Sequence, residues 1–452
     1  MYVARLRLDG VRGFRGIRRV DLDFQRPDGG YAGWTVLAGR NGSGKTTLLR
    51  AIALGLAGYR RASQLDGRIE DHLSHGLKRG SLTVELRADP QADTGAAPGG
   101  ETLKAELLWQ PEREPVTDDD VPPTDHRFRG GGRIDTLLWS SAPPRGWFHA
   151  GYGPFRRITG TGLYERDAQQ PDRTDALRTL FDERTALTEA FDWLRSVHTR
   201  RLEKRPGAQE LMADVLALLN DGLLPDRVSI EDVDSEGMWL RGSDESGAIG
   251  PRIELRRMSD GQRTVVALVL DIVRQMHAAY GSLDVQDRNG RPWLPHPGVV
   301  LIDEVDAHLH MTWQQRIGEW LTRHFPAIQF IVSTHSPYIC QAADPGGLIR
   351  LPGVGEQEPP RHVDEDLYRR IVYGTGDDAA LSELFGLDSP YSEEAREKRQ
   401  ELVDLEMLMV TGRADDAQRR RYAEIRDELS SSPVARVDEV MARIGRSWEG
   451  RP

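Results

Sequence analysis

The sequence feature that most constrains this chain is a run that matches the pattern G-x-x-x-x-G-K-T. The run consists of Gly39, Arg40, Asn41, Gly42, Ser43, Gly44, Lys45 and Thr46. An apolar segment at 34–38 precedes it and a helix-compatible segment follows it, which is the strand, loop and helix context of a phosphate-binding loop. The glycines let successive backbone N–H groups point inward and form an anion nest at a helix N-terminus. The run therefore predicts a site for a nucleotide polyphosphate.

Two residues of this loop have separate chemical tasks. We expect Lys45 to reach the β- and γ-phosphates of ATP as a point charge, and the hydroxyl of Thr46 to bind Mg²⁺. Thr47 extends the predicted binding segment into the helix. The lysines stand at positions 45, 78, 104, 204 and 398, so one of very few ammonium groups lies where the chemistry requires one. A glycine-rich turn that binds nothing is the alternative, and the completeness of the match argues against it.

The composition limits the class of protein without naming a partner. A chain of 452 residues can form two or three domains, or one large α/β domain with insertions. The single cysteine, Cys340, excludes an internal disulfide and favours a reducing compartment. No apolar run approaches the roughly 20 residues of a membrane span, so we expect a cytoplasmic protein without a membrane partner. The net charge of -11 argues against non-specific coating of nucleic acid but does not exclude a local basic surface.

The segment before the loop is basic and strand-like. Residues 2–8 alternate as a strand, and a second apolar set at 20–24 follows a turn that contains Phe14. The arginines of this segment are Arg5, Arg7, Arg12, Arg15, Arg18 and Arg19. They are compatible with solvated strand edges or with contact to DNA, and basic runs are more often surface.

Insertions and a helical lobe are predicted after the loop. Residues 88–133 are rich in Asp, Pro and Gly, and we interpret them as inserted loops on both sides of a strand at 102–109. Residues 147–156 indicate a buried strand that runs into a turn. Helices predicted at 175–203 and 209–219 form a compact lobe over about 165–225, and short antiparallel strands follow. No heptad pattern persists up to residue 258, so a long coiled coil is not expected.

A pair of carboxylates follows a second apolar strand at 299–302. This strand is rich in β-branched residues, as expected of a parallel strand covered on both faces. Asp303 and Glu304 come directly after it. Beside a polyphosphate, Asp303 can hold the Mg²⁺ shell and Glu304 can polarise the attacking water as general base. An ordinary strand end is the alternative, and the position downstream of a phosphate-binding loop argues against it.

The tetrapeptide that begins at Ser259 leads into a helix predicted at 265–277. Ser259 can cap this helix, so a well-made N-terminus is one explanation. The sequence Ser-Asp-Gly-Gln also resembles the signature of ABC-type ATPases, and the chain resembles that superfamily from residue 1 to about 345. In such proteins the signature faces the γ-phosphate held by a second subunit. The resemblance therefore implies an ATP-sandwiched homodimer, or a higher homo-oligomer, in which Ser259, Gly261 and Gln262 complete the partner's site.

Two further segments extend the resemblance. Residues 305–310 match the D-loop region, which implies that Asp306 takes part in the nucleotide site. Residues 331–337 match the switch segment, in which His335 would contact the γ-phosphate. A lone histidine is more often structural, but its place at a strand end after this order of motifs favours function. The Q-loop glutamine has no obvious counterpart, and residues 152–156 occupy roughly that place.

Residues 303–314, 325–330 and 334–337, with Phe14-Arg15, resemble the RecF/SMC/OLD group of AAA family ATPases. That resemblance implies an α/β fold: a mixed sheet flanked by helices, a small helical lobe, and a C-terminal helical extension over 346–452. Helical patterns occur at 380–385, 392–410, 415–429 and 434–444. OLD-type proteins continue into a TOPRIM nuclease, but the acidic run at 364–366 is better explained as a solvated helix cap. The layout resembles the ATPase subunit of Septu-type anti-phage systems.

These resemblances imply an ATP hydrolase whose open and closed dimers act as a switch. The preferred output is control of a separate nuclease, of HNH or TOPRIM type, in antiviral defence. A DNA-repair ATPase that binds DNA ends or gaps is one alternative, and an ATP-binding scaffold with little turnover is another. A transporter motor is less favoured because no membrane-coupling segment is evident.

Overall fold

A computed structural model describes residues 1–96, 100, 102–111, 126–138, 144–156, 173–225, 227–243, 248–387 and 389–429. Most of the predicted loop at 111–133, the start of the predicted lobe at 165–172 and the helix predicted at 434–444 lie outside the described residues. The chain divides into two compact units, Met1–Phe385 and Gly386–Pro452.

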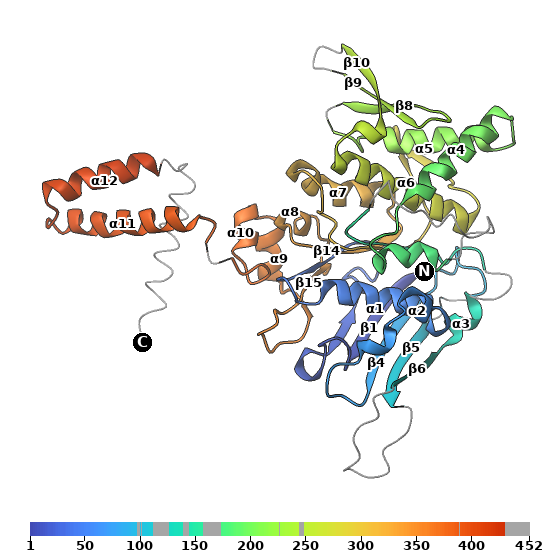
Figure 1. Ribbon diagram of the computed structural model, residues 1–452, viewed down its shortest axis with the longest axis horizontal. Coiled ribbons are helices and arrows are strands. Elements are labelled where there is room, and N and C mark those ends of the chain that lie inside the picture. Colours follow the sequence, from blue (N-terminus) through green and yellow to red (C-terminus); the bar gives the residue numbers. More distant parts are fainter. Residues whose placement is uncertain are drawn as a thin grey trace, which may run out of the picture. The chain divides into compact units, whose positions relative to one another are not determined.

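A six-stranded sheet in the order β16-β15-β3-β14-β13-β7 forms the centre of the first unit (Figure 1). Its strands are β3 (Gly33–Ala38), β7 (His149–Tyr152), β13 (Gly298–Ile302), β14 (Ile328–Thr334), β15 (Leu348–Arg350) and β16 (Arg361–His362). All neighbours pair in parallel except β16, which is antiparallel to β15. Because parallel strands end at the same edge of a sheet, the segments after β3, β14, β13 and β7 are brought together.

An antiparallel sheet in the order β2-β1-β4-β5-β6 forms a second layer of this unit. Its strands are β1 (Tyr2–Asp9), β2 (Val20–Asp23), β4 (Gly80–Arg87), β5 (Thr102–Pro111) and β6 (His126–Gly131). The strand predicted at 102–109 is confirmed. The segment of β6 was predicted to be a loop, because its composition is typical of turns. This prediction was wrong, since its backbone forms an antiparallel pair with β5 and so satisfies the hydrogen-bonding groups on that edge of β5.

Helix α1 (Lys45–Ala57) packs in one apolar cluster with residues of both sheets. Gly55 allows the closest approach, because a Cβ atom there would lie 2.2 Å from Cγ2 of Val84 in β4. The shorter elements of this part of the chain are η1 (Gly16–Arg18), α2 (Tyr59–Leu65), η2 (Ile69–His72) and α3 (Arg133–Leu137). The helix that begins at the phosphate-binding loop is therefore closely packed against both sheets.

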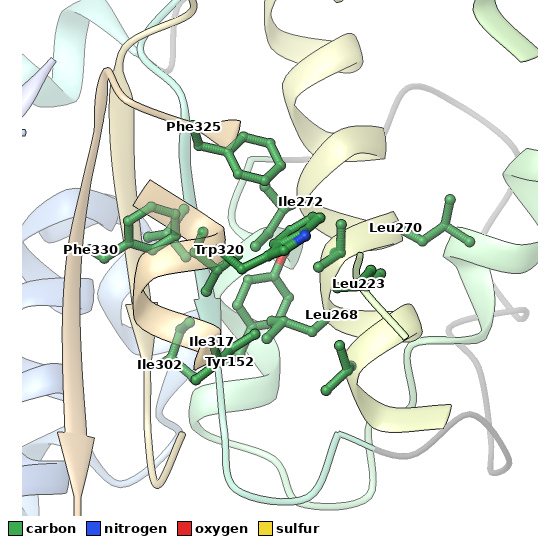
Figure 2. Packing of buried hydrophobic residues seen from close by; sticks show 14 of the residues in the cluster. Tyr152, Leu223, Leu268, Leu270, Ile272, Ile302, Ile317, Trp320, Phe325 and Phe330 are labelled. Atoms are coloured by element: carbon green, nitrogen blue, oxygen red, sulfur yellow. The ribbon is translucent and has the colours of Figure 1, made fainter. Parts of the chain in front are cut away.

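A second apolar cluster joins the central sheet to the helices on its other face. Figure 2 shows Tyr152 and Ile302 from the sheet against Leu268 and Ile272 of α6 (Asp260–Tyr280), with Trp320 of α7 (Met311–His324) nearby. The Tyr152 hydroxyl donates a 2.9 Å hydrogen bond to Asp271. α6, the predicted signature helix, is therefore anchored along its length to the strands that end in the candidate site.

The helical lobe differs in one respect from its prediction. The helix expected at 175–203 is divided into η3 (Asp175–Leu180) and α4 (Thr188–Leu202). Asp182 forms a local turn between them, since its carboxylate accepts from the backbone N–H of Arg184 at 3.0 Å and competes with helical bonding. The second predicted helix is confirmed as α5 (Ala208–Asn220). The predicted short strands are confirmed as an antiparallel sheet of β8 (Val228–Val233), β9 (Met238–Ser243) and β10 (Ile249–Glu254).

The first unit extends past the domain boundary predicted at residue 345, because β15 adds to the central sheet beside β3. Its remaining elements are η4 (Leu255–Arg257), β11 (Gln286–Arg288), β12 (Arg291–Trp293), α8 (Pro337–Cys340), α9 (Glu365–Val372) and α10 (Gly376–Ala380). The helix predicted at 380–385 is not formed. α10 begins earlier, at a capping box on Thr375, and the Ser382 hydroxyl bonds back to the Ala379 carbonyl at 2.6 Å. The acidic cap predicted at 364–366 is confirmed, since Asp364 caps α9.

The second unit contains α11 (Glu393–Val410) and α12 (Asp416–Glu428), which confirm two of the predicted tail helices. Arg421 of α12 donates to Glu401 of α11 at 2.9 Å, and Ile425 is fully buried. Within the described ranges the longest helix is α6 with 21 residues, so they contain no long coiled-coil arm. None of the helices described has both the length and the apolar character that crossing a bilayer requires.

Candidate nucleotide-binding site

The predicted phosphate-binding loop connects β3 to α1 as expected. Gly42 (φ +75°) and Gly44 (φ +99°) lie in the left-handed region that favours glycine. A Cβ atom on Gly44 would also lie 2.4 Å from the Phe14 ring, so the turn before β2 packs directly against the loop. Gly39 is equally constrained, because its Cβ atom would lie 2.5 Å from the Leu351 carbonyl oxygen. The loop is therefore packed closely against Phe14 on one side and Leu351 on the other.

The Lys45 ammonium is held beneath this loop. It donates to the carbonyls of Gly39 at 2.8 Å and Arg40 at 3.3 Å, and the residue is 6% exposed. Burial lowers the pKa of Lys45, against the opposing effect of Asp303, Glu304 and Asp306. Thr46 and Thr47 are partly buried at the start of α1, and Arg40 and Asn41 are exposed. Lys45 thus faces the carboxylates that the sequence predicted for the same site.

Asp303 lies at the end of β13 and is 2% exposed. Its Oδ1 accepts a hydrogen bond from Ser333 Oγ, which in turn accepts from the Glu304 backbone N–H at 2.8 Å. No described group donates to its other carboxylate oxygen. A buried carboxylate with one available oxygen and the Thr46 hydroxyl fit the oxygen ligands that Mg²⁺ prefers. Among the described residues, no group of three or more His, Cys, Asp or Glu is arranged so that it could hold a metal ion by itself.

Glu304 adopts a left-handed backbone conformation with φ +45°. Such a conformation is uncommon for a residue with a side chain and persists where neighbouring contacts impose it. Here Ser333 Oγ accepts from its N–H and Arg156 donates to its carbonyl at 3.1 Å. Its side chain is partly exposed, so it can meet a water molecule at the mouth of the site.

Arg156, which sequence reasoning missed, organises the carboxylate segment. Its guanidinium donates to the carbonyls of Gly153 (3.1 Å), Asp303 (2.9 Å), Glu304 (3.1 Å), Val305 (3.4 Å) and Ala307 (3.4 Å). Burial lowers the pKa of Arg156 to about 10, which still leaves it charged at neutral pH. The residue lies in the segment predicted to replace the Q-loop, but nothing local in the sequence indicates its partners.

Asp306 is tied to the switch segment of the same chain. Its Oδ1 accepts from the Thr334 hydroxyl and from the His335 backbone N–H at 3.3 Å. The His335 side chain is exposed at the same sheet edge. Partial burial and the Lys45 charge lower the pKa of His335, so its imidazole is neutral at pH 7. The structure thus brings Lys45, Asp303, Glu304, Asp306 and His335 together.

The predicted signature begins α6 with a capping box. The Ser259 hydroxyl accepts from the Gln262 N–H, and the Gln262 side chain accepts from the Ser259 N–H at 3.2 Å. All hydrogen bonds of these two residues fall within this helix start, and Ser259 is exposed. Gly261 packs against the D-loop region, since a Cβ atom on it would lie 2.5 Å from the His308 carbonyl oxygen. The structure therefore confirms the cap and leaves the signature facing outward.

Comparison with known families locates these motifs in two matched segments. Residues 167–341 match the family described as "AAA domain, putative AbiEii toxin, Type IV TA system", and residues 5–94 match a second AAA domain family. Together the two segments contain the phosphate-binding loop, the signature, the carboxylates and the switch. The resemblance to ABC-type AAA ATPases is confirmed.

Individual relatives of this ATPase group support the same assignment. The chain is 24% identical over 422 residues to the Septu protein PtuA of Bacillus mycoides (strain KBAB4), covering 93% of this chain and 50% of that protein. It is 46% identical over 90 residues to the "Retron Vc95 probable ATPase" of Vibrio cholerae serotype O1 biovar El Tor, covering 20% of this chain and 16% of that protein. The chain thus spans half or less of the length of these relatives.

Among solved structures, an SMC head bound to the C-terminal winged-helix domain of ScpA aligns with a TM-score of 0.48 at 16% identity. The alignment covers 80% of this chain and 98% of that one.

The arginines before the phosphate-binding loop largely have partners within the chain. Arg5 pairs with Asp21 and Arg7 with Glu85, in both cases across neighbouring strands of the antiparallel sheet. Arg18 donates to the carbonyls of residues 352–354, beside the phosphate-binding loop. Because the strand arginines pair with carboxylates of neighbouring strands, these contacts agree with the explanation that the basic segment forms solvated strand edges.

Proposed function

We propose that this chain binds Mg-ATP between two copies of itself and hydrolyses it, and that the open and closed dimers switch a separate nuclease in anti-phage defence. One observation carries the proposal: Lys45, Glu304 and His335 follow three neighbouring parallel strands and meet at one sheet edge. Phosphate binding, water activation and γ-phosphate sensing can then occur within one site.

The roles of the residues follow from their surroundings. The loop N–H groups and Lys45 bind the phosphates, and Lys45 must exchange its carbonyl partners for phosphate oxygens when ATP enters. Mg²⁺, held by Thr46 and Asp303, would neutralise charge on the phosphates. Glu304 orients the attacking water and accepts its proton, while Arg156 and Ser333 fix the backbone that carries Glu304. His335, neutral at pH 7, can donate a hydrogen bond to the γ-phosphate.

A second copy would complete the site. Ser259 lies exposed at the N-terminus of the long helix α6, where unpaired N–H groups and the helix dipole favour an anion. A γ-phosphate bound to the partner's loop provides such an anion. The Gly261 contact with the D-loop region would make the signature and the D-loop approach the partner together.

The defence role is supported by similarity to Septu and retron proteins. We expect the partner to be a nuclease of HNH or TOPRIM type supplied by another chain. The test is to co-express this chain with nuclease products of neighbouring genes and to measure complex formation and DNA cleavage with ATP and with a non-hydrolysable analogue. ATP-dependent cleavage by a complex supports the proposal. Hydrolysis stimulated by DNA ends without any nuclease partner would favour a DNA-repair ATPase, and tight ATP retention with slow single turnover would favour a scaffold.

A further inference from the structure

The side-chain amide of Gln314 on α7 joins two segments of the candidate nucleotide site. Its Nε2 atom donates to the Leu309 carbonyl at 2.8 Å, near the end of the D-loop region. Its Oε1 atom accepts a 2.7 Å hydrogen bond from the Ser336 hydroxyl, in the switch segment. The D-loop region comes after β13 and the switch segment after β14, so Gln314 connects the ends of two neighbouring parallel strands.

These bonds close a ring of hydrogen bonds. The Ser336 N–H donates to the Thr334 hydroxyl oxygen at 2.9 Å, and the Thr334 hydroxyl donates to the Asp306 carboxylate. The Leu309 N–H donates to the Asp306 carbonyl at 3.0 Å, which returns the ring to the D-loop region. Thr334 and Ser336 are buried, so water competes little for these groups. The D-loop region and the switch are therefore connected twice, through Asp306 and through Gln314.

The position of Gln314 requires a group that donates on one side and accepts on the other, as an amide does. The Leu309 carbonyl can only accept, so the amide NH₂ group must face it. The Ser336 hydroxyl oxygen already accepts from the Tyr338 N–H at 3.2 Å, and its own proton is directed to Oε1. An ionised glutamate would still accept from Ser336, but it would place a carboxylate oxygen against the Leu309 carbonyl. Gln314→Glu therefore opens the ring at one bond and keeps the size of the side chain.

The ring includes the backbone of the predicted γ-phosphate sensor. His335 lies between Thr334 and Ser336, and its side chain is exposed at the sheet edge. On the other side of the ring, the D-loop region contacts the start of α6, since a Cβ atom on Gly261 would lie 2.5 Å from the His308 carbonyl oxygen. A displacement of the His335 backbone would therefore be passed to the segment that contacts the signature.

We propose that Gln314 is a positioning residue that makes the D-loop region and the switch segment move as one unit. Contact of the γ-phosphate with His335 then sets the surface that meets a second copy of the chain. This role rests on the proposed function, because it assumes that ATP binds between two copies. The connection between the two segments does not rest on it and can be measured without nucleotide.

Hydrogen exchange of the full chain without nucleotide tests the connection. Gln314→Glu should make the backbone amides of residues 305–310 and 333–337 exchange about 2- to 10-fold faster, the effect of one neutral hydrogen bond. Gln341→Glu is the matched control, because Gln341 is also partly buried and donates to a carbonyl, that of Gly374 at 3.0 Å, outside the ring. The control should leave both segments unchanged. Unchanged exchange at 333–337 in Gln314→Glu would overturn the connection.

Ser336→Ala opens the ring at its other side and keeps the test decisive if Gln314→Glu folds poorly. Each single variant should lower kcat for ATP hydrolysis by roughly 100-fold, the cost of a misplacement of about 1 Å, and should retain ATP affinity through the loop of Lys45. The double variant should be no slower than the slower single variant, because a ring that is already open cannot be opened again. Losses that multiply in the double variant would overturn the shared positioning role.

The ratio of dimer formed with ATP to dimer formed with ADP, measured by light scattering, tests the link to the second copy. Gln314→Glu should bring this ratio close to one, whereas Gln341→Glu should keep the wild-type ratio. A wild-type ratio and a wild-type kcat in Gln314→Glu would overturn the positioning role in a chain that hydrolyses ATP. If the unmodified chain neither hydrolyses ATP nor dimerises with it, the proposed function fails and the role of Gln314 in hydrolysis fails with it. The exchange experiment still decides the connection in that case.

Discussion

The guanidinium of Arg156 donates a 2.9 Å hydrogen bond to the main-chain carbonyl of Asp303. This contact joins the segment after β7 to the segment after β13, and the same guanidinium also reaches the carbonyls of Glu304, Val305 and Ala307. The backbone position of the proposed general base is therefore set by a residue far from it in sequence. A movement of the segment after β7 would move Glu304.

Arg156→Lys tests this dependence. A lysine retains the charge but has one nitrogen, which cannot serve carbonyls spread across the reach of a guanidinium. A misplacement of the base by about 1 Å can cost roughly 100-fold in rate. We expect kcat for ATP hydrolysis to fall by about this factor while ATP affinity stays near wild type.

Arg50→Lys is the matched control, because Arg50 also donates to a carbonyl, that of Leu180 at 2.7 Å, without contacting the carboxylate segment. It should retain near wild-type kcat. Full activity in Arg156→Lys would show that Ser333 and the strand alone position Glu304.

At this site, the sequence predicted the features that neighbouring residues determine and missed those that depend on contacts between distant residues. The phosphate-binding loop and the Asp303-Glu304 pair are each defined by neighbouring residues, so their structural context could be predicted from the sequence pattern. Arg156 was missed because its partners are carbonyls, which no residue identity records. The break between η3 and α4 was missed because the Asp182 turn outweighs an apolar spacing that continues across it. β6 was missed because its pairing partner, β5, determines its state more than its own composition.

Gly261→Ala tests the contact between the signature and the D-loop region. The new Cβ atom would lie 2.5 Å from the His308 carbonyl oxygen, so the backbone must shift at His308 or at the start of α6. We expect ATP-dependent dimerisation and hydrolysis to fall together, with ATP binding by each chain retained. Gly67→Ala is the control, since a Cβ atom there meets nothing within 4 Å. Unchanged hydrolysis in Gly261→Ala would show that this contact adjusts without consequence for the site.

Lys45→Ala should abolish nucleotide binding, because the loop loses the ammonium placed against the β- and γ-phosphates. A charge-assisted bond in a desolvated site contributes several kcal/mol, on the order of 2–4, which corresponds to a loss of roughly 30- to 1,000-fold in affinity. Isothermal titration with ATP measures it. Lys104→Ala, a change at an exposed lysine, should bind like the wild type. Unaltered affinity in Lys45→Ala would refute the assignment of the loop.

Glu304→Gln should retain ATP and lose the base that orients water. Turnover should fall roughly 10²- to 10⁴-fold, and the protein should accumulate as an ATP-bound dimer. Phosphate release and light scattering after size exclusion measure the two effects. The control is Glu319→Gln on α7, which removes the charge of an exposed carboxylate. Wild-type turnover in Glu304→Gln would place the base on another carboxylate near Asp306.

Ser259→Arg tests whether the site is shared between two chains. A bulky cation at the exposed start of α6 should block approach of the partner's γ-phosphate, while each chain still binds ATP through its own Lys45 and Thr46. Hydrolysis and ATP-dependent dimerisation should both be lost. Ser259→Ala is the control for the helix cap, since it removes the same hydroxyl at a cost of about 1 kcal/mol of folding stability without adding bulk. It should retain most of the dimerisation.

Mixing Ser259→Arg with Lys45→Ala gives the sharper test. In a mixed dimer, one site combines the altered signature with the altered loop, and the other site combines a normal signature with a normal loop. Activity should therefore return in the mixture although each variant is inactive alone, rising with the fraction of mixed dimers. If mixed dimers form, as shown by two distinguishable tags, and the mixture stays inactive, either each site lies within one chain or both sites must act together. Dimerisation of Ser259→Arg alone with ATP separates these outcomes, because a site within one chain leaves it unaffected.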